Sequence, residues 1–478
     1  MSKVLAFLSY GVNAGVMLAV ALFLATTLTA AEYSRYSFAV ATAQTLAVCI
    51  FEWLRMAATR YYPGPTPSDT ANLRGAFLGG QYLISICAVI STWAIARWLG
   101  DYSWLLITCY AVLQGVVDLQ FTMLRFDARL RLFSKLQTTR GILALALAVS
   151  AAFLFQNANA ALLGGILANI LTVAMLEFSQ PGFVLVRPTV RQISQLRQMA
   201  TYGVSAAAAG GLYQFGPFLM RCAAFRGASE TSYAAFSLVV DLMQRPYNVA
   251  LTALNGVFFP DAVREHDRSP NSERIALRRL YAIQVWCLLL IFGCAMAFRH
   301  ELMPLIVKSP LVPHVLEVFP YLAAFFLVHA AIQTTSALVL HLSRAGLKLI
   351  IQAALELGGI AILTVFSTFV FGAGIVPVAC GGMLGAIIGI LFTASDWRDV
   401  PCRLPWTSWA VALITTLVLL VVGQTDSPDQ IQGFLYKITI VAPVVAIGGF
   451  LGLAIPFGLL GRLHQYRLRV VQPTESIP

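Results

Sequence analysis

Charged side chains are scarce throughout this chain of 478 residues. Lys, Arg, Asp and Glu make up 11% of the sequence, whereas hydrophobic residues make up 59%. A soluble protein of this length needs a polar surface that so few charged residues cannot supply. The composition therefore excludes a soluble protein and predicts one that lies in a lipid bilayer.

Several motifs of soluble enzymes and metal proteins are also missing. The eight cysteines form no CxxC pair and no zinc-like spacing with histidine. No GxxxxGK[ST] motif is present, so no nucleotide-driven motor is expected. The net charge of +11 is not concentrated in the basic runs of a nucleic-acid module. We therefore expect no metal, no cofactor, no disulfide, no enzyme activity and no nucleic-acid partner.

In place of these features the sequence has about fourteen long apolar runs, since about 20 apolar residues suffice for a helix to cross a bilayer. The first run is too long for a cleaved signal peptide, and more runs follow it. The expected spans are Val4–Thr29, Tyr36–Ala58, Gly75–Trp98, Tyr102–Leu124, Leu136–Phe155, Ala160–Leu176, Ala200–Met220, Tyr233–Phe259, Leu280–Phe298, Tyr321–Leu342, Leu349–Phe371, Gly372–Phe392, Trp406–Val422 and Ile438–Leu460. The sixth span is short and the eleventh and twelfth run together, so a count of twelve stays open.

Positive charges alternate between the two ends of these spans. Of the 32 Lys and Arg residues, Arg245 lies near the middle of a span and few lie at the ends that we assign to the outside. That outside group is Arg35, Arg97, Arg221, Arg226, Arg299, Lys308 and Lys437. Such a bias is the positive-inside pattern, and it predicts a multi-pass protein with both termini in the cytoplasm. The outside loops are short, and 299–320 is the only sizeable one expected.

A weak internal repeat relates the two halves of the chain. Ala31–Phe38 and Ser229–Phe236 match at Glu32 and Glu230, at Ser34 and Ser232, and at their last residues. Because six spans separate the two segments, the halves share one orientation, as in transporters whose repeats are related along the membrane normal. The predicted organisation is an N-lobe of six helices, a cytoplasmic linker, a C-lobe of six helices, two further helices and a cytoplasmic tail. The corresponding ranges are 1–180, 181–199, 200–396, 397–461 and 462–478.

Four local patterns resemble the polysaccharide exporters of the multidrug/oligosaccharidyl-lipid/polysaccharide (MOP) superfamily. The segment 24–36, LATTLTAAEYSRY, resembles the family's first-hairpin pattern, with Thr and Ala in place of the usual Gly and Pro. The other three are Glu52–Arg55 with Thr59–Tyr62, the basic link from Leu124 through Arg131 to Arg140, and the turn Gly372–Gly374. The resemblance extends over the whole chain, but each motif is degenerate.

This resemblance implies a two-lobed, alternating-access flippase of the bacterial inner membrane. The implied cargo is a polyprenyl-diphosphate-linked oligosaccharide, such as an O-antigen or exopolysaccharide repeat unit. Membrane lipids, a polysaccharide polymerase and a co-polymerase are the other candidate partners. Many members have twelve helices, and fourteen occur in branches that include the lipid II flippases.

Polar residues inside the apolar runs are the candidate functional groups, because ionisable side chains in a membrane are costly and tend to be buried, paired or functional. Asp241 and Arg245 lie one helical turn apart, as do Glu52 and Arg55. A guanidinium binds phosphate oxygens, and amides and aromatic rings suit sugars. The predicted cleft residues are Arg245, Asp241, Arg55, Glu52, Asn13, Gln214, Tyr213 and Phe215. The ion-coupling candidates are Asp241, Glu356, His329 and Asp118.

Structural roles fit many of the same residues. Each acid–arginine pair also fits a buried clamp, and Asp118 also fits the membrane interface. His329 is of a kind more often found as a hydrogen-bonded core residue, and Tyr213 and Phe215 suit packing or lipid contact. Gly381, Gly385 and Gly389 predict close helix packing.

Three functions remain open from the sequence. Besides an oligosaccharide flippase, the chain fits a drug or cation antiporter of the same superfamily, or a flippase of the lipid II type. A membrane glycosyltransferase fits less well, because such enzymes usually carry catalytic groups on a large extracytoplasmic loop.

Overall fold

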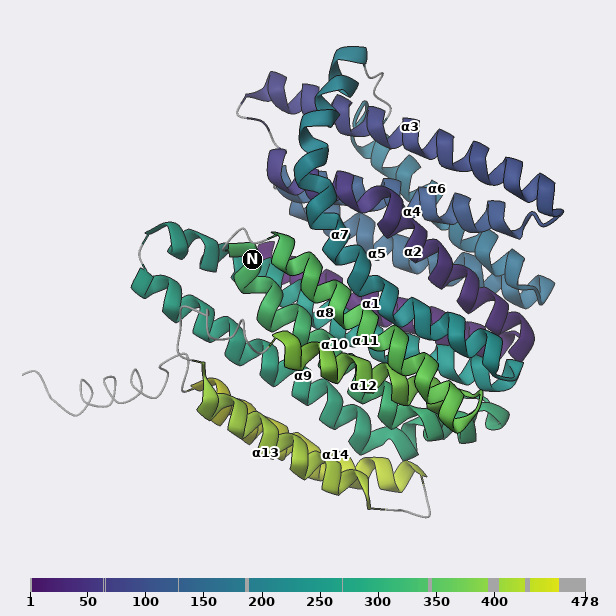
Figure 1. Cartoon of the computed structure of the whole chain (residues 1–478), viewed down its shortest axis with the longest axis vertical. Coiled ribbons are helices and arrows are strands. Elements are labelled where there is room, and N and C mark those ends of the chain that lie inside the picture. Colours follow the sequence, from purple (N-terminus) through teal and green to yellow (C-terminus); the bar gives the residue numbers. More distant parts are fainter. Residues whose placement is uncertain are drawn as a thin grey trace, which may run out of the picture. The chain divides into compact units, whose positions relative to one another are not determined.

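The computed structural model describes residues 2–62, 64, 66–127, 129–184, 189–268, 270–342, 346–393, 404–425 and 430–454. Over these ranges it contains fourteen α-helices, one 3-10 helix and no strand (Figure 1). The α-helices are α1 Ser2–Thr27, α2 Ala30–Tyr61, α3 Pro67–Leu99, α4 Ser103–Phe126, α5 Leu130–Phe155, α6 Ala158–Ser179, α7 Val190–Gly227, α8 Glu230–Arg268, α9 Pro270–Ile306, α10 Val312–Leu342, α11 Gly346–Phe371, α12 Ile375–Thr393, α13 Trp406–Gly423 and α14 Gln430–Ala454. The predicted all-α fold is confirmed.

These helices are long and apolar enough to form a multi-pass membrane protein. Eleven of them qualify as candidate spans by length and hydropathy, and a shorter apolar helix covers Gly11–Thr27. Large apolar side chains are exposed along α3 and α11, including Ile90, Trp93, Phe366 and Phe369. A surface of this kind is stable in contact with lipid tails, whereas water would disfavour it.

The helices extend beyond several predicted spans. We expected connections at 260–279 and 299–320, but α8 reaches Arg268, α9 begins at Pro270 and ends at Ile306, and α10 begins at Val312. Likewise α7 begins at Val190, inside the predicted linker. Hydropathy reports the apolar length of a helix, and polar turns beyond the bilayer add helical residues that this signal does not detect.

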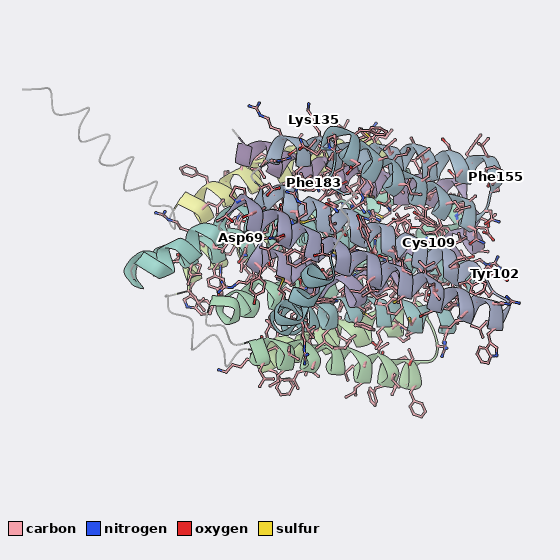
Figure 2. All side chains as sticks on the ribbon, turned by 90° about the horizontal axis from the view of Figure 1, so that it is seen from above. Asp69, Tyr102, Cys109, Lys135, Phe155 and Phe183 are labelled. Atoms are coloured by element: carbon pink, nitrogen blue, oxygen red, sulfur yellow. The ribbon has the colours of Figure 1, made fainter. Side chains whose placement is uncertain are left out.

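The chain divides into two compact units. Unit 1 comprises Met1–Arg245, Val307–Phe325 and Ser343–Phe392. Within it α2 packs along α4 and α7, α5 packs between α1 and α6, and α11 packs on α7. In Figure 2, Tyr102 and Phe155 lie at one end of these helices and Asp69 lies toward the other, as the predicted alternation of ends requires.

Glycines allow α12 to approach α11 within unit 1. A Cβ atom at Gly381 would overlap the backbone of Leu363 and Thr364, and one at Gly385 would overlap Ile360. At Gly389 an added Cβ would lie 3.0 Å from the Cβ of Glu356. The predicted glycine stripe is therefore a close helix–helix contact.

Unit 2 comprises Pro246–Ile306, Phe326–Leu342 and Thr393–Pro478. In it α13 and α14 lie side by side and pack on α9. Lys437 of α14 forms a buried ion pair with Glu301 of α9 (Nζ to Oε1, 2.7 Å) and also donates to the carbonyl oxygen of Ala297 (3.2 Å). The predicted boundaries of the N-lobe and the C-lobe stay predictions.

Candidate functional site

A cavity of about 210 Å³ lies in unit 1. Six helices contribute to its wall, namely α1, α2, α4, α5, α6 and the first part of α8. Its lining residues are Asn13, Met17, Val20, Tyr36, Val40, Gln44, Tyr110, Gln114, Arg140, Ala144, Ala148, Gly165 and Arg245. We call it the basic cavity, because its described lining carries two guanidinium groups and no carboxylate.

Arg245 is half-buried and brings a positive charge into the basic cavity from α8. Its Nε atom is buried without a hydrogen-bond partner, and no ion pair joins Arg245 to any residue that the structure describes. No described carboxylate therefore neutralises the charge of this guanidinium inside the helix bundle. An anion that enters the cavity would therefore gain a strong interaction with Arg245.

Arg140 faces the same cavity from α5 and is already partly neutralised. Its Nη1 donates to Asp118 Oδ1 (3.0 Å) and its Nε to Asn169 Oδ1 (2.9 Å). Its Nη2 makes no hydrogen bond to a described residue. Arg140 is thus oriented by two neighbours while keeping donor capacity toward the cavity.

Neutral polar groups complete the wall. Gln44 and Gln114 supply amides, and Tyr36 and Tyr110 supply phenol groups. The Asn13 Oδ1 atom is buried with no hydrogen-bond partner among the described residues. Groups of this kind bind hydroxyl and phosphate oxygens, so the basic cavity suits a small anion with further hydrogen-bonding capacity.

At the end of α2 that we predict to be extracytoplasmic, α2 is sealed against α7 and α8. The Ser34 hydroxyl donates to the Glu230 carbonyl oxygen (2.9 Å), and the Phe38 and Phe225 rings stack with centroids 4.5 Å apart. Thr29 caps α2 and Ser229 caps α8, each accepting from a backbone N–H three residues on. The two segments of the predicted internal repeat thus lie at the starts of α2 and α8, and a hydrogen bond joins them. We call the contacts of α2 with α7 and α8 the seam.

An arginine lies at the centre of the seam. Arg221 of α7 is 4% exposed, and its Nη2 bonds Asp241 Oδ1 of α8 (2.7 Å) while its Nη1 donates to Ser37 Oγ of α2 (2.8 Å). The ion pair that we expected between Asp241 and Arg245 is therefore wrong: the described partner of Asp241 is Arg221. Helical spacing places Asp241 and Arg245 on one face of α8, but Arg221 of the neighbouring helix α7 lies within ion-pair distance of Asp241.

The cytoplasmic end of α2 carries the other predicted acid–arginine pair. Glu52 and Arg55 form an ion pair within α2, and Glu52 is 8% exposed. Neither residue belongs to the described lining of the basic cavity. Asp118 is also absent from this described lining, but it forms an ion pair with Arg140, which lines the cavity.

Other predicted residues lie apart from this cavity. Tyr213 is buried, Gln214 is half-buried, and Phe215 packs edge-on against Phe218; none of the three belongs to its described lining. In unit 2, His329 shares a hydrogen bond with Gln333 (2.9 Å). Glu356 is buried against α12 at Gly389. Their roles in binding and coupling stay predictions.

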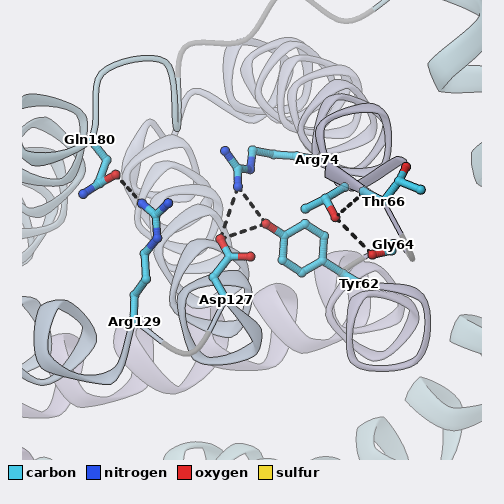
Figure 3. Close-up of polar contacts among 8 residues, drawn as sticks. Tyr62, Gly64, Thr66, Arg74, Asp127, Arg129 and Gln180 are labelled. Atoms are coloured by element: carbon cyan, nitrogen blue, oxygen red, sulfur yellow. Dashed lines mark hydrogen bonds and ion pairs between the residues drawn. The ribbon is translucent and has the colours of Figure 1, made fainter. Parts of the chain in front are cut away.

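The ends of α2, α3 and α4 are joined by a polar cluster on the predicted cytoplasmic side (Figure 3). Tyr62 donates to Asp127 Oδ2 (3.0 Å), and Arg74 Nη2 donates to the Tyr62 oxygen (2.8 Å) and pairs with Asp127 (3.2 Å). Burial raises the pKa of Tyr62 to about 12, and the adjacent Asp127 carboxylate acts in the same direction. The phenol therefore stays neutral and acts as a fixed link between the helix ends.

Sequence reasoning missed Arg140 and Arg221. Arg140 lies inside the expected span Leu136–Phe155, but its charge is grouped with the basic residues of the cytoplasmic link. Arg221 is assigned to the outside because the apolar run ends at Met220. In the structure both are inside helices, α5 and α7. The signal that could have found Arg221 is the apolar sequence on both of its sides, which indicates that the helix continues beyond Met220.

Comparison with known proteins identifies the fold. No protein-family model and no curated protein matches the chain. Among solved structures it is similar to the lipid II flippase MurJ in an inward closed conformation, with a TM-score of 0.72 and 12% identity, over 94% of this chain and 98% of that one. It is also similar to an inward-facing multidrug resistance MATE family transporter of the MOP superfamily (TM-score 0.58, 13% identity, 82% and 94% covered). A MOP superfamily transporter from Pyrococcus furiosus gives a TM-score of 0.54 at 13% identity, with 83% and 96% covered.

These similarities establish the class of fold. The chain has the two-lobed all-α fold of MOP superfamily transporters and flippases. Its structural neighbours are transporters and flippases rather than enzymes. At such low identity, the cargo of these neighbours is not carried over to this chain by the comparison.

Proposed function

We propose that this protein is a flippase that moves a polyprenyl-diphosphate-linked oligosaccharide across the bacterial inner membrane. The observation that carries the proposal is the basic cavity, where Arg245 has no acidic partner among the described residues. A diphosphate is the part of such a lipid that cannot cross a hydrocarbon core about 30 Å thick unaided. Two guanidinium groups supply the charge and the paired donors that phosphate oxygens require.

The volume of the basic cavity fits the phosphate part of the cargo. About 210 Å³ accommodates a small anion but not a sugar chain of several residues. We infer that this conformation is a closed one and that the oligosaccharide enters when the helices separate. The polyprenyl tail stays in the lipid throughout, so only the headgroup needs shelter.

The seam supplies a means of coupling the cycle to protons. A proton taken up by Asp241 from the extracytoplasmic side would neutralise the carboxylate and leave Arg221 as an unpaired buried charge. That loss weakens the ion pair that joins α7 to α8 and holds the Arg221 guanidinium against Ser37 of α2, which favours opening of the seam.

A drug or cation antiporter is the second candidate, because MATE transporters share the fold. The described lining of the basic cavity argues against it. Two arginines and no carboxylate repel an organic cation, whereas they attract a diphosphate. A lipid II-type cargo shares the diphosphate chemistry and differs in the group that the diphosphate carries.

Deletion of the gene tests the proposal. Lipid-linked oligosaccharide should accumulate on the cytoplasmic leaflet, surface polysaccharide should be lost, and sensitivity to cationic drugs should stay the same. Restoring the wild-type gene should reverse these effects, whereas an Arg245→Ala gene expressed at equal abundance should not. Altered drug sensitivity with normal surface polysaccharide would point instead to the antiporter. Purified protein in vesicles should also translocate a polyprenyl-diphosphate-linked sugar.

A further inference from the structure

A second hollow lies on unit 1, away from the basic cavity. It measures about 640 Å³ and is formed by α1, α5 and α6. Its lining residues are Val12, Arg131, Leu132, Ser134, Lys135, Leu136, Thr138, Thr139, Met175 and Ser179. We call it the α1–α5–α6 groove. None of its lining residues lines the basic cavity, so cargo binding does not account for it.

One end of the groove carries two free positive charges. Arg131 and Lys135 lie one turn apart near the start of α5, both exposed, and neither forms an ion pair with a described residue (Figure 2 labels Lys135). The described lining contains no carboxylate. The first turn of α5 adds to the positive potential, since its N-cap, Arg129, provides no side-chain acceptor.

A buried hydroxyl in the same wall lacks a partner. Ser134 is 5% exposed, and its Oγ atom makes no hydrogen bond within the described structure. Buried polar atoms in native proteins are nearly always hydrogen-bonded, so an unpaired one in the wall of a groove indicates a missing partner. Thr138 and Thr139 add two further hydroxyls along the same helix.

The remaining wall is apolar and continues onto a lipid-facing surface. Val12 and Met175 are 48% and 40% exposed, and Leu171 and Phe178 on α6 are exposed as well. The groove thus combines a cationic end with an apolar path. A free phosphate would use only the first of these features, whereas a phospholipid would use both.

The position of the groove agrees with the depth of a headgroup. The 26 residues of α5 make it roughly 39 Å long at 1.5 Å per residue. Because the hydrocarbon core is only about 30 Å thick, the first turns of α5 lie at headgroup level. The charge bias predicts that this end is cytoplasmic, where anionic lipids attract basic residues.

We propose that the α1–α5–α6 groove binds one anionic phospholipid of the cytoplasmic leaflet. Its phosphate lies against Arg131 and Lys135, its glycerol or phosphate oxygens accept from Ser134, and an acyl chain follows Met175 and Val12. Such a lipid would fill the space beside α1, which forms part of the wall of the basic cavity.

Native mass spectrometry of the purified protein with phosphatidylglycerol and phosphatidylcholine tests this site. Phosphatidylglycerol should bind more tightly than phosphatidylcholine, and the double variant Arg131→Gln/Lys135→Gln should bind it about 30-fold more weakly. That factor corresponds to about 1 kcal/mol for each surface charge. The control Arg60→Gln/Arg278→Gln removes two exposed charges outside the groove and should change binding less than about threefold.

Two further arms keep the test decisive. Met175→Trp fills the groove without changing charge and should also lower phosphatidylglycerol binding, even if the double variant folds poorly. Excess inorganic phosphate should not displace the lipid. Equal losses in the groove and control variants, no loss in Met175→Trp, or full displacement by inorganic phosphate would each overturn the proposal.

Discussion

The seam and the basic cavity each contain an arginine of unit 1, but only the arginine of the seam has a described acidic partner. In the seam, Arg221 is held by Asp241 and by the Ser37 hydroxyl of a third helix. In the basic cavity, Arg245 has no acidic partner among the described residues and faces open volume. A paired guanidinium closes an interface between helices, whereas an unpaired one is ready to receive an anion.

The two arginines should also contribute differently to stability and to anion binding. A buried ion pair contributes little net stability, yet removing one partner strands the other charge. An unpaired arginine beside a polar cavity is already partly solvated, so its removal costs little stability and mainly lowers affinity for an anion. Removal of Arg221 should therefore lower mainly the stability of the protein, whereas removal of Arg245 should lower mainly its affinity for an anion.

The largest expected effect is on the seam. Arg221→Ala should lower the free energy of unfolding by about 3–5 kcal/mol, because it leaves the half-buried Asp241 carboxylate without its cation. Thermal or denaturant unfolding in detergent measures this change. The double variant Arg221→Met/Asp241→Leu should recover most of the loss. If the double variant is as unstable as Arg221→Ala, the ion pair is not the reason for the loss.

A somewhat smaller effect is expected at the basic cavity, and on affinity only. Arg245→Ala should weaken binding of a polyprenyl diphosphate by about 1.5–3 kcal/mol, the range for a hydrogen bond to a charged group. Unfolding stability should change by less than about 0.5 kcal/mol. Arg226→Ala, an exposed arginine on α7, is the control and should bind like wild type. A large loss of stability in Arg245→Ala would contradict the prediction, because Arg245 would then stabilise the fold as Arg221 does.

Most of the fold could be predicted from the sequence, whereas the pairing of charges could not. Apolar runs and the alternation of Lys and Arg predicted the helices, and Arg245 and Asn13 stood out because they lie inside those runs. The partner of Asp241 depends on how α7 and α8 pack, which spacing along one helix does not encode. Arg140 and Arg221 were missed because each lies near the end of an apolar run, where sequence alone does not separate a charge at the membrane surface from one inside the bundle.

A third variant tests whether the close contact between α11 and α12 contributes to the stability of unit 1. Gly385→Ala places a Cβ against the backbone of Ile360 and should cost about 1–3 kcal/mol of stability by overpacking. Gly358→Ala, whose Cβ would meet nothing within 4 Å, is the matched control. Unfolding of both purified variants gives the comparison. Equal stabilities would show that α11 and α12 separate easily.

The smallest effect is expected at the other end of α2. Tyr62→Phe removes the hydrogen bonds to Asp127 and Arg74 and should cost about 1 kcal/mol at neutral pH. Because the folded state raises the pKa of Tyr62 to about 12, the wild-type advantage should persist below pH 10 and vanish as pH rises through 12. Unfolding measured against pH checks this. A difference that grows above pH 10 would mean that the folded state favours the ionised phenol.

A structure of the protein bound to a polyprenyl-diphosphate-linked sugar tests the central claim most directly. The account predicts phosphate density in the basic cavity, with oxygens within hydrogen-bonding distance of the Arg245 guanidinium and Arg140 Nη2. Phosphate bound elsewhere, with Arg245 turned toward lipid and the cavity empty, would contradict it.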